Sequence, residues 1–332
     1  TMQGVRLLGN EQIEIGEFQD PVPGPGEALI GLRYSALCGS ELGAYRSSKP
    51  MAFNAGHEAM GVVVETNGTQ ALKPGDRVGV HAIWGCGQCN WCQEGKYTYC
   101  DKRRGTPGTH AQLLAAPEHA LVKLADDIPD EVGVLLSGDG LGVPYHAAKR
   151  IGTQPGDVVV VLGVGPIGLG NTLMQSFLGT EVIAVDVNDR RLELARELGA
   201  RHLINSRETD PIAAVKDITR GAMAHCCIEC VGRSDALLQA FRLVGKAGTV
   251  MALGEQGDVP VNIGRDLIRQ DITLMGSWFF HLSEYEQMAE LYRRGLAVEK
   301  LVTHRFPLRD AAKAFAEFAA GRTGKVLLQM PE

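Results

Sequence analysis

The hydrophobic pattern changes character partway along the chain. Up to about residue 123, short apolar runs alternate with Gly and Pro, and helical periodicity is almost absent. This pattern predicts a small, partly closed β-barrel. The expected strands are residues 4–8, 27–35, 60–65, 77–81 and 119–124.

The later part of the chain alternates strands with helices. Its apolar runs are rich in β-branched residues, as in parallel strands that are buried on both faces. Strand and helix alternation predicts a doubly wound parallel sheet, so the fold class is α/β. The expected strands are residues 158–162, 182–185, 202–205, 225–231, 249–253 and 272–276, and the expected helices are 166–178, 190–198, 211–219 and 235–244.

Helical patterns also occupy residues 128–151, 284–295 and 308–321. The first of these is predicted to cross between two domains, with His146 as a packed helix histidine. At 332 residues the chain is long enough for two domains with separate cores.

A glycine turn follows the first strand of the α/β part. Gly163, Gly165 and Gly168 have G-x-G-x-x-G spacing, Pro166 and Ile167 open the following helix, and Asp186 ends the next strand. This arrangement predicts a dinucleotide site, because the glycines and the helix N-terminus accommodate a pyrophosphate. Asp186 accepts hydrogen bonds from ribose hydroxyls and repels a 2′-phosphate, which favours NAD over NADP. A purely structural glycine turn is the alternative.

Composition and charge limit the classes of protein to which this chain can belong. The net charge of −6 argues against a nucleic-acid partner. No apolar run approaches the length of a membrane span, and the N-terminal segment lacks the features of a signal peptide. We therefore expect a cytoplasmic enzyme, in which the eight cysteines are metal ligands or core residues before they are disulfides.

Four cysteines cluster within a glycine-rich lobe, residues 84–102. Cys86, Cys89, Cys92 and Cys100 supply four thiolates, which close a tetrahedral shell and leave no open position. We predict a structural zinc ion there. An iron–sulfur cluster and four unpaired core cysteines are the alternatives.

A second set of metal-binding residues is spread along the chain. Cys38, His57, Glu58 and Asp139 each lie beside glycines, near the end of an apolar run. A thiolate, an imidazole and a carboxylate give three ligands and an exchangeable fourth position, which is the arrangement of a catalytic zinc. A buried core cysteine and a capped histidine explain two members equally well.

The order of four motifs resembles a known family. CGSE (38–41), GHEAMGVV (56–63), the four-cysteine lobe and GVGPIG (163–168) resemble the zinc-containing medium-chain dehydrogenase/reductase family, along almost the whole chain. The resemblance implies a GroES-like catalytic domain and a Rossmann domain, two zinc ions and hydride transfer to NAD. It places the discontinuous catalytic domain at 1–148 and 290–332, closed by strand 325–329, and the NAD-binding domain at 149–289.

The resemblance also assigns roles to residues of the reactive site. Cys38, His57 and Asp139 match the three zinc ligands, and Glu58 matches an acid that either ligates the zinc or lies behind its ligands. Ser40 matches the hydroxyl that begins the proton's path to solvent. Gly43 stands where many relatives have a relay histidine, so Tyr45, a water chain or a ribose hydroxyl continues the path.

Further positions follow from the resemblance or from the local pattern. Relatives place an arginine over the adenosine, which nominates Arg191, although a solvated first-turn arginine is the alternative. The nicotinamide would be lined by Leu253, Gly254, Ser277 and Trp278. His110, on a loop, is also available to the proton's path, but we interpret it as a solvated turn residue. Cys226, Cys227 and Cys230 are interpreted as core residues, because 227 and 230 point to opposite faces of a strand.

These observations predict an NAD-dependent zinc enzyme that oxidises a secondary alcohol, a polyol or a sugar-derived cyclitol, as a homodimer or homotetramer. A ketone or aldehyde reductase that uses the same site is one alternative. A dinucleotide-binding scaffold without catalysis is the other, and the missing relay histidine is its only support.

Overall fold

The structure is a computed structural model that describes residues 1–51 and 53–331. It divides into two compact units, Thr1–Gly142 with Phe279–Glu332 and Val143–Trp278. Both boundaries lie earlier in the chain than the predicted domain boundaries, which follow residues 148 and 289. At the second boundary, the rings of Phe279 and Phe280 lie edge-on against His81, which assigns this segment to the first unit.

The first unit is built on an open, mostly antiparallel sheet. Its strand order is β16-β17-β3-β4-β5-β9, with β8 paired to β3, and a separate hairpin joins β1 to β2. The strands are β1 (Met2–Gly9), β2 (Gln12–Phe18), β3 (Glu27–Ala36), β4 (Glu58–Asn67), β5 (Arg77–Val80), β6 (Ile83–Trp84), β7 (Arg104–Gly105), β8 (Leu113–Pro117), β9 (Leu121–Lys123), β16 (Val302–Pro307) and β17 (Lys325–Gln329).

The pairing of β3 with β4 forms the centre of this sheet. The two backbones approach closely, since a Cβ on Gly61 would lie 2.3 Å from the Gly31 carbonyl oxygen. Side chains from both strands then enter a core that also contains Phe315 and Phe318. The sequence pattern did not identify β2, β8 and β16.

The helices of the first unit are short, and the helical pattern predicted at 128–151 is confirmed with one interruption. Residues 128–151 form two helices, α3 (Asp130–Ser137) and α4 (Asp139–Ile151). They are separated by Gly138, whose backbone is extended and whose Cβ would lie 2.8 Å from both Glu58 Oε2 and the Val134 carbonyl oxygen. The boundary between the units falls within α4. The other helices are α1 (Leu42–Arg46), α2 (Asn90–Gln93), α9 (Tyr285–Arg293) and α10 (Ala311–Ala319).

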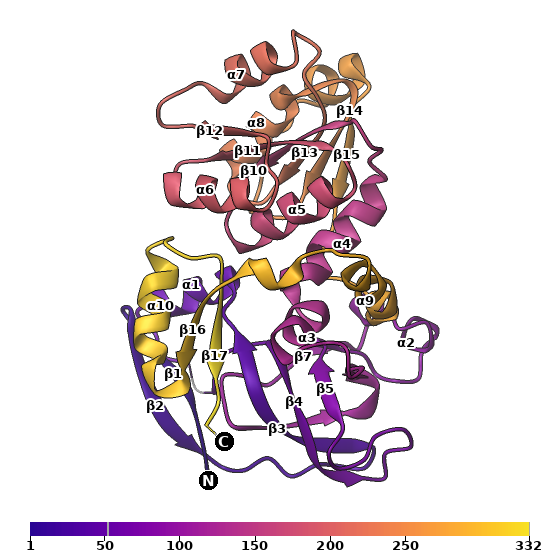
Figure 1. The fold of residues 1–332 in the computed structure, drawn as a ribbon, viewed down its shortest axis with the longest axis vertical. Helices are drawn as coiled ribbons and strands as arrows, with labels where there is room; N and C mark the ends of the chain where they lie inside the picture. The colour runs from indigo at the N-terminus through magenta and orange to yellow at the C-terminus, as the bar shows by residue number, and fades with distance from the viewer. Residues whose placement is uncertain (52, 332) are drawn as a thin grey trace. The chain divides into compact units, whose positions relative to one another are not determined.

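The second unit contains a six-stranded parallel sheet in the order β12-β11-β10-β13-β14-β15. Helices α5 and α6 lie on one side of it, and α7 and α8 lie on the other (Figure 1). The predicted doubly wound sheet is therefore confirmed. Its elements are β10 (Val158–Leu162), α5 (Pro166–Phe177), β11 (Glu181–Asp186), α6 (Asp189–Glu197), β12 (His202–Asn205), α7 (Pro211–Ile218), β13 (Ala224–Glu229), α8 (Ser234–Leu243), β14 (Val244–Ala252) and β15 (Thr273–Gly276).

The glycine turn between β10 and α5 has three distinct environments. Gly163 has a φ of +86°, which favours glycine, and a Cβ on Gly168 would lie 2.0 Å from the Gly163 carbonyl oxygen. A Cβ on Gly165 would meet nothing within 4 Å. Packing therefore requires the first and third glycines, while the second leaves open space at the helix N-terminus.

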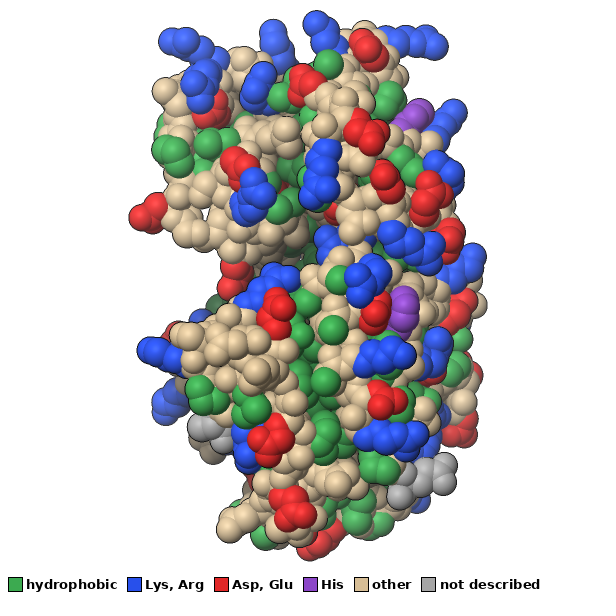
Figure 2. Space-filling view, turned by 90° about the vertical axis from the view of Figure 1, so that its left-hand side faces the viewer, with side chains coloured by type: hydrophobic (Ala, Val, Ile, Leu, Met, Phe, Trp, Pro, Cys, Tyr) green, Lys and Arg blue, Asp and Glu red, His purple; other side chains and the backbone are tan. Residues whose placement is uncertain are grey.

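Among residues 1–51 and 53–331, every helix is too short or too polar to cross a bilayer. On the face drawn in Figure 2, basic and acidic side chains are interspersed.

The contrast between Gly165 and Gly168 can be tested by stability measurements. We expect Gly168→Ala to lower the free energy of unfolding by about 1–3 kcal/mol, because the added methyl group overlaps a backbone oxygen. Gly165→Ala should change it by less than about 0.5 kcal/mol. Denaturant unfolding of the two variants checks this, and equal losses would contradict the packing argument.

Candidate metal centres and nucleotide site

Four potential ligands meet in the first unit. One ligand atom from each of Cys38, His57, Glu58 and Asp139 can be chosen so that all lie within 4.8 Å of one another. Asp139 Oδ2 is central, 3.2 Å from Cys38 Sγ and 3.1 Å from His57 Nε2. The structure therefore brings together residues that are up to 101 positions apart in the sequence.

Three structural features position these side chains. Cys38 follows the end of β3, and Glu58 begins β4, which pairs with β3 in antiparallel register. Gly56, with a φ of +97°, turns the chain immediately before His57. The break at Gly138 starts α4 at Asp139. The site is thus assembled where two strands and a helix begin or end.

The electrostatics of this cluster suit a cation. Burial and the neighbouring Asp139 carboxylate raise the pKa of the Cys38 thiol. Burial alone would also raise the pKa of Asp139, but the imidazole of His57 lowers it to about 2. The other carboxylate oxygen, Asp139 Oδ1, is buried without a hydrogen-bond partner. A divalent ion would satisfy this oxygen and stabilise the thiolate, so the donor set fits zinc.

Glu58 is held by other groups. Its Oε1 accepts a short hydrogen bond from Lys325 Nζ, and its Oε2 accepts one from the Gly140 amide at 3.2 Å. Glu58 is fully buried and Lys325 is 1% exposed. Burial raises the pKa of Glu58 to about 7, although Lys325 opposes this shift. The carboxylate therefore lies beside the other ligands but is already engaged.

The proposed start of the proton path has an open environment. Ser40 is exposed in the 3-10 turn Gly39–Glu41. A Cβ on Gly43 would meet nothing within 4 Å. Tyr45 is buried and packs on Phe315, with ring centroids 5.4 Å apart.

The interpretation of His110 as a solvated turn residue is wrong. Its side chain is fully buried, and a Cβ on Gly56 would lie 2.6 Å from its Nδ1. Nδ1 lies 2.7 Å from Ser35 Oγ, and Nε2 lies 3.0 Å from Glu41 Oε1. The sequence offered one hint, which is the adjacent pair of polar residues before the apolar strand β8.

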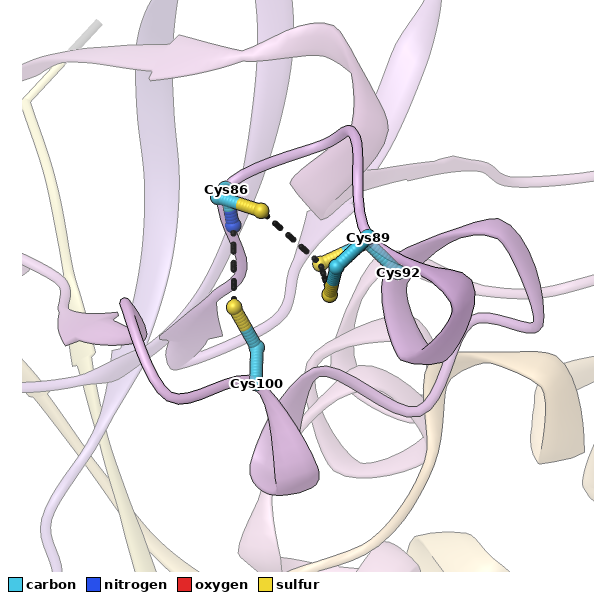
Figure 3. Close-up of side chains that lie close together, drawn as sticks. All are labelled: Cys86, Cys89, Cys92 and Cys100. Carbon is cyan, nitrogen blue, oxygen red and sulfur yellow. Dashed lines mark hydrogen bonds between the residues drawn. The ribbon is translucent and has the colours of Figure 1, made fainter.

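The four lobe cysteines direct their sulfur atoms toward one another (Figure 3). Cys89 Sγ lies 3.5 Å from Cys92 Sγ, which lies 4.0 Å from Cys86 Sγ. All four thiols are free, and a tetrahedral Zn–S₄ shell has S–S separations of about 3.8 Å. The geometry therefore fits one zinc ion.

The lobe has a small apolar cluster of its own. Its apolar cluster contains only Cys92, Tyr97 and Cys100 as buried members, with four partly buried neighbours. Backbone N–H groups of the 87–89 turn lower the pKa of Cys86 to about 6, while burial raises that of Cys92 to about 12. A bound cation would keep all four thiols deprotonated and would link them through metal–sulfur bonds. These bonds would stabilise the fold of the lobe beyond what its small apolar cluster provides.

The carboxyl ends of the parallel strands carry the residues of the candidate nucleotide site. Asp186 ends β11, and its Oδ2 accepts a hydrogen bond from the Val164 amide at 2.8 Å. Oδ1 accepts from the amides of Val187 and Asn188. Three of about four lone-pair positions are therefore used, and the fixed carboxylate retains one for a ribose hydroxyl.

Leu253, Gly254, Ser277 and Trp278 follow the ends of β14 and β15, and Arg191 lies within α6. Arg191 Nε and Ser277 Oγ are buried without hydrogen-bond partners, as expected of groups that await a ligand. Trp278 is 45% exposed. The amides of Leu253 and Gly254 donate to the Glu229 carbonyl oxygen.

Sequence reasoning missed the Glu229 side chain, which is fully buried at the end of β13. Its Oε1 accepts from the amides of Val231 and Gly232, and its Oε2 accepts from Gln256 Nε2. A single carboxylate thus joins the two loops that follow β13 and β14.

The prediction that the three nearby cysteines are core residues is confirmed for Cys226 and Cys227, while Cys230 is only partly buried. Cys226 and Cys227 are buried in β13, and Cys230 follows its end. Among the described residues they form no group that could hold a metal ion. Burial raises the pKa of all three thiols.

Comparisons with known proteins agree with this architecture. Residues 24–126 match the family described as alcohol dehydrogenase GroES-like domain, and residues 166–294 match the family described as zinc-binding dehydrogenase. The chain is 30% identical to an L-threonine 3-dehydrogenase of Symbiobacterium thermophilum, over 99% of this chain and 97% of the relative. It is also 30% identical to a sorbitol dehydrogenase of Halalkalibacterium halodurans, over 96% of each.

A solved structure shows the same fold. The alcohol dehydrogenase TADH from Thermus sp. ATN1 has a TM-score of 0.90 and 27% sequence identity, and covers 99% of this chain and 100% of its own. Since similarity extends along nearly the whole chain in both sequence and structure, the chain belongs to the zinc-type medium-chain alcohol dehydrogenase family of oxidoreductases, with a GroES-like domain and a Rossmann domain.

Proposed function

We propose that the protein catalyses the NAD-dependent oxidation of a secondary alcohol, a polyol or a sugar-derived cyclitol. The observation that carries this proposal is the convergence of Cys38, His57 and Asp139, with the buried Asp139 Oδ1 left without a partner. When bound, zinc supplies a Lewis acid for the hydroxyl oxygen, and NAD accepts a hydride from the carbon that bears it.

The chain's own residues then handle the proton. Ser40 is exposed two residues after Cys38, where its hydroxyl can accept the substrate proton and pass it on. The open space around Gly43 favours water as the next carrier. The products are a carbonyl compound, NADH and a proton released to solvent.

We infer that Glu58 acts from behind the ligands. Its two oxygens already accept hydrogen bonds from Lys325 and from the Gly140 amide. Direct ligation would require one of these bonds to break, and leaving Lys325 buried without its partner is costly. Cys38, His57 and Asp139 are therefore the proposed ligands.

The preference for NAD rests on Asp186. Backbone amides fix its carboxylate at the end of β11, and burial leaves it 7% exposed. A phosphate on the ribose 2′ position would meet this negative charge. Gly163, Gly165, Gly168, Pro166 and Ile167 would hold the pyrophosphate at the N-terminus of α5.

The substrate class is inferred from chemistry and from the relatives. The substrates named for the two curated relatives, sorbitol and L-threonine, both carry a secondary hydroxyl group. Reduction of a ketone or an aldehyde in the same site is the reverse reaction. A scaffold without catalysis finds support only in Gly43, and the assembled ligand set weighs against it.

We further propose that two copies associate through β15. This strand is one of the two edges of the parallel sheet, and Leu274 within it is 40% exposed. Ile263 and Ile268 nearby in sequence are 55% and 68% exposed. An exposed edge with apolar neighbours favours pairing with a second copy. Light scattering should give at least twice the chain mass, and a monomer would contradict the proposal.

The reaction can be tested by the initial rate of NAD reduction across primary alcohols, secondary alcohols, polyols, sugars, cyclitols and threonine. We expect a secondary alcohol or polyol to be oxidised, with NADP much slower. Cys38→Ala should lower kcat at least about 1000-fold, because it removes a ligand of the proposed Lewis acid. Full turnover by this variant would overturn the proposal, and preference for NADP would show that Asp186 is not the selector.

The structural ion can be tested by metal analysis of the purified protein. We expect two zinc ions per chain, and Cys92→Ser should lose one of them together with resistance of residues 84–102 to proteolysis. Cys226→Ala, which removes a buried thiol of the second unit that belongs to neither cluster, is the matched control and should retain two. A wild-type content of one would favour the non-catalytic scaffold.

A further inference from the structure

A buried polar network lies beside the proposed metal centre. It consists of Ser35, Glu41, Thr109 and His110, and none of these residues has a part in the proposed chemistry. Three of them are fully buried and Glu41 is 8% exposed. Buried polar groups are costly unless they are paired, so a network of four calls for a structural or functional reason.

One end of the network contacts the backbone of β4. Ser35 Oγ donates to the Glu58 carbonyl oxygen at 3.0 Å. Ser35 Oγ also lies 2.7 Å from His110 Nδ1 and 2.9 Å from Thr109 Oγ1. Since the single hydroxyl proton is used for Glu58, the two neighbours donate to Ser35.

The other end contacts the backbone of the cysteine ligand. Glu41 Oε2 accepts a hydrogen bond from the Cys38 amide at 2.8 Å. Glu41 Oε1 lies 3.0 Å from His110 Nε2. His110 therefore joins the two ends, and a continuous path runs from the Glu58 carbonyl group to the Cys38 amide.

The imidazole also fixes the chain before the histidine ligand. A Cβ on Gly56 would lie 2.6 Å from His110 Nδ1 and 2.7 Å from Thr109 Oγ1. The backbone adjacent to His57 thus rests directly on the network. On its other side, the ring of His110 lies edge-on to Phe315, with centroids 5.8 Å apart.

We propose that His110 is a positioning residue of the metal centre, acting through Glu41 and Ser35 on the backbone at Cys38, His57 and Glu58. The inference rests on the proposed function, because it requires an ion at Cys38, His57 and Asp139. Groups that orient metal ligands from behind typically change metal affinity by about 10–100-fold when they are removed. Simple core packing of the ring against Phe315 would have no such effect.

The test uses His110→Phe, which keeps a ring against Phe315 but deletes both nitrogen atoms. Cobalt(II) replaces the exchangeable ion, and the spectrum of a Cys38→Ala protein is subtracted to isolate the thiolate-to-cobalt band. We expect the band to shift and cobalt loss to a chelator to become about 10–100-fold faster. His110→Gln, which keeps one hydrogen-bond partner, should fall between His110→Phe and wild type, and the KM for NAD should not change.

His202→Phe is the matched control, because it removes an imidazole 2.7 Å from the Glu181 carboxylate in the second unit. It should leave the spectrum and the rate of cobalt loss unchanged. A wild-type spectrum and rate for His110→Phe would overturn the inference alone. A wild-type protein without the Cys38-dependent band would overturn the metal centre itself, and the inference with it. If His110→Phe does not fold, Ser35→Ala is measured in its place with the same criteria.

Discussion

The buried ion pair between Lys325 and Glu58 is the constraint on which the first unit depends. Lys325 begins β17, near the end of the chain, and Glu58 begins β4, next to the proposed histidine ligand. Both side chains are almost inaccessible to water, and loss of one partner from such a pair typically costs about 3–5 kcal/mol. The return of the chain to the first unit therefore completes the surroundings of the metal site and does more than fill the sheet.

The same constraint explains why three potential anions can share one buried location. Cys38, Glu58 and Asp139 would repel one another if each carried an uncompensated charge. Lys325 neutralises Glu58, and the imidazole of His57 lies against Asp139. The thiolate and the free carboxylate oxygen remain, and these are the groups that a divalent ion would compensate. The cluster therefore fits a cation, while the carboxylate of Glu58 is already paired with Lys325.

Local sequence patterns predicted the parts of the fold that local chemistry determines. The glycine spacing, the apolar strand before it and Asp186 after it lie within one βαβ unit, so their meaning does not depend on the rest of the chain. The four lobe cysteines are likewise close in sequence. The break at Gly138 could not be predicted, because the group that occupies its Cβ space is Glu58, a residue from another strand.

The burial of His110 also could not be predicted from its local sequence. A histidine between threonine and alanine in a glycine-rich loop looks solvent-exposed, and only the fold buries it between Ser35 and Glu41. The local sequence predicts Lys325 only as part of a closing strand. Its ion pair could not be predicted, because its partner Glu58 lies 267 residues away in sequence.

The proposed site is asymmetric, and the asymmetry suits its chemistry. On the buried side, His110, Glu41 and Ser35 connect the backbones that carry the ligands, which restricts their movement. On the other side, Ser40 is exposed and Gly43 leaves open space, so water and substrate can exchange. A relay histidine at position 43 would occupy part of that space. Its absence is therefore compatible with catalysis, because a proton that reaches Ser40 is already next to solvent, while the work of holding the metal ligands falls to residues behind them.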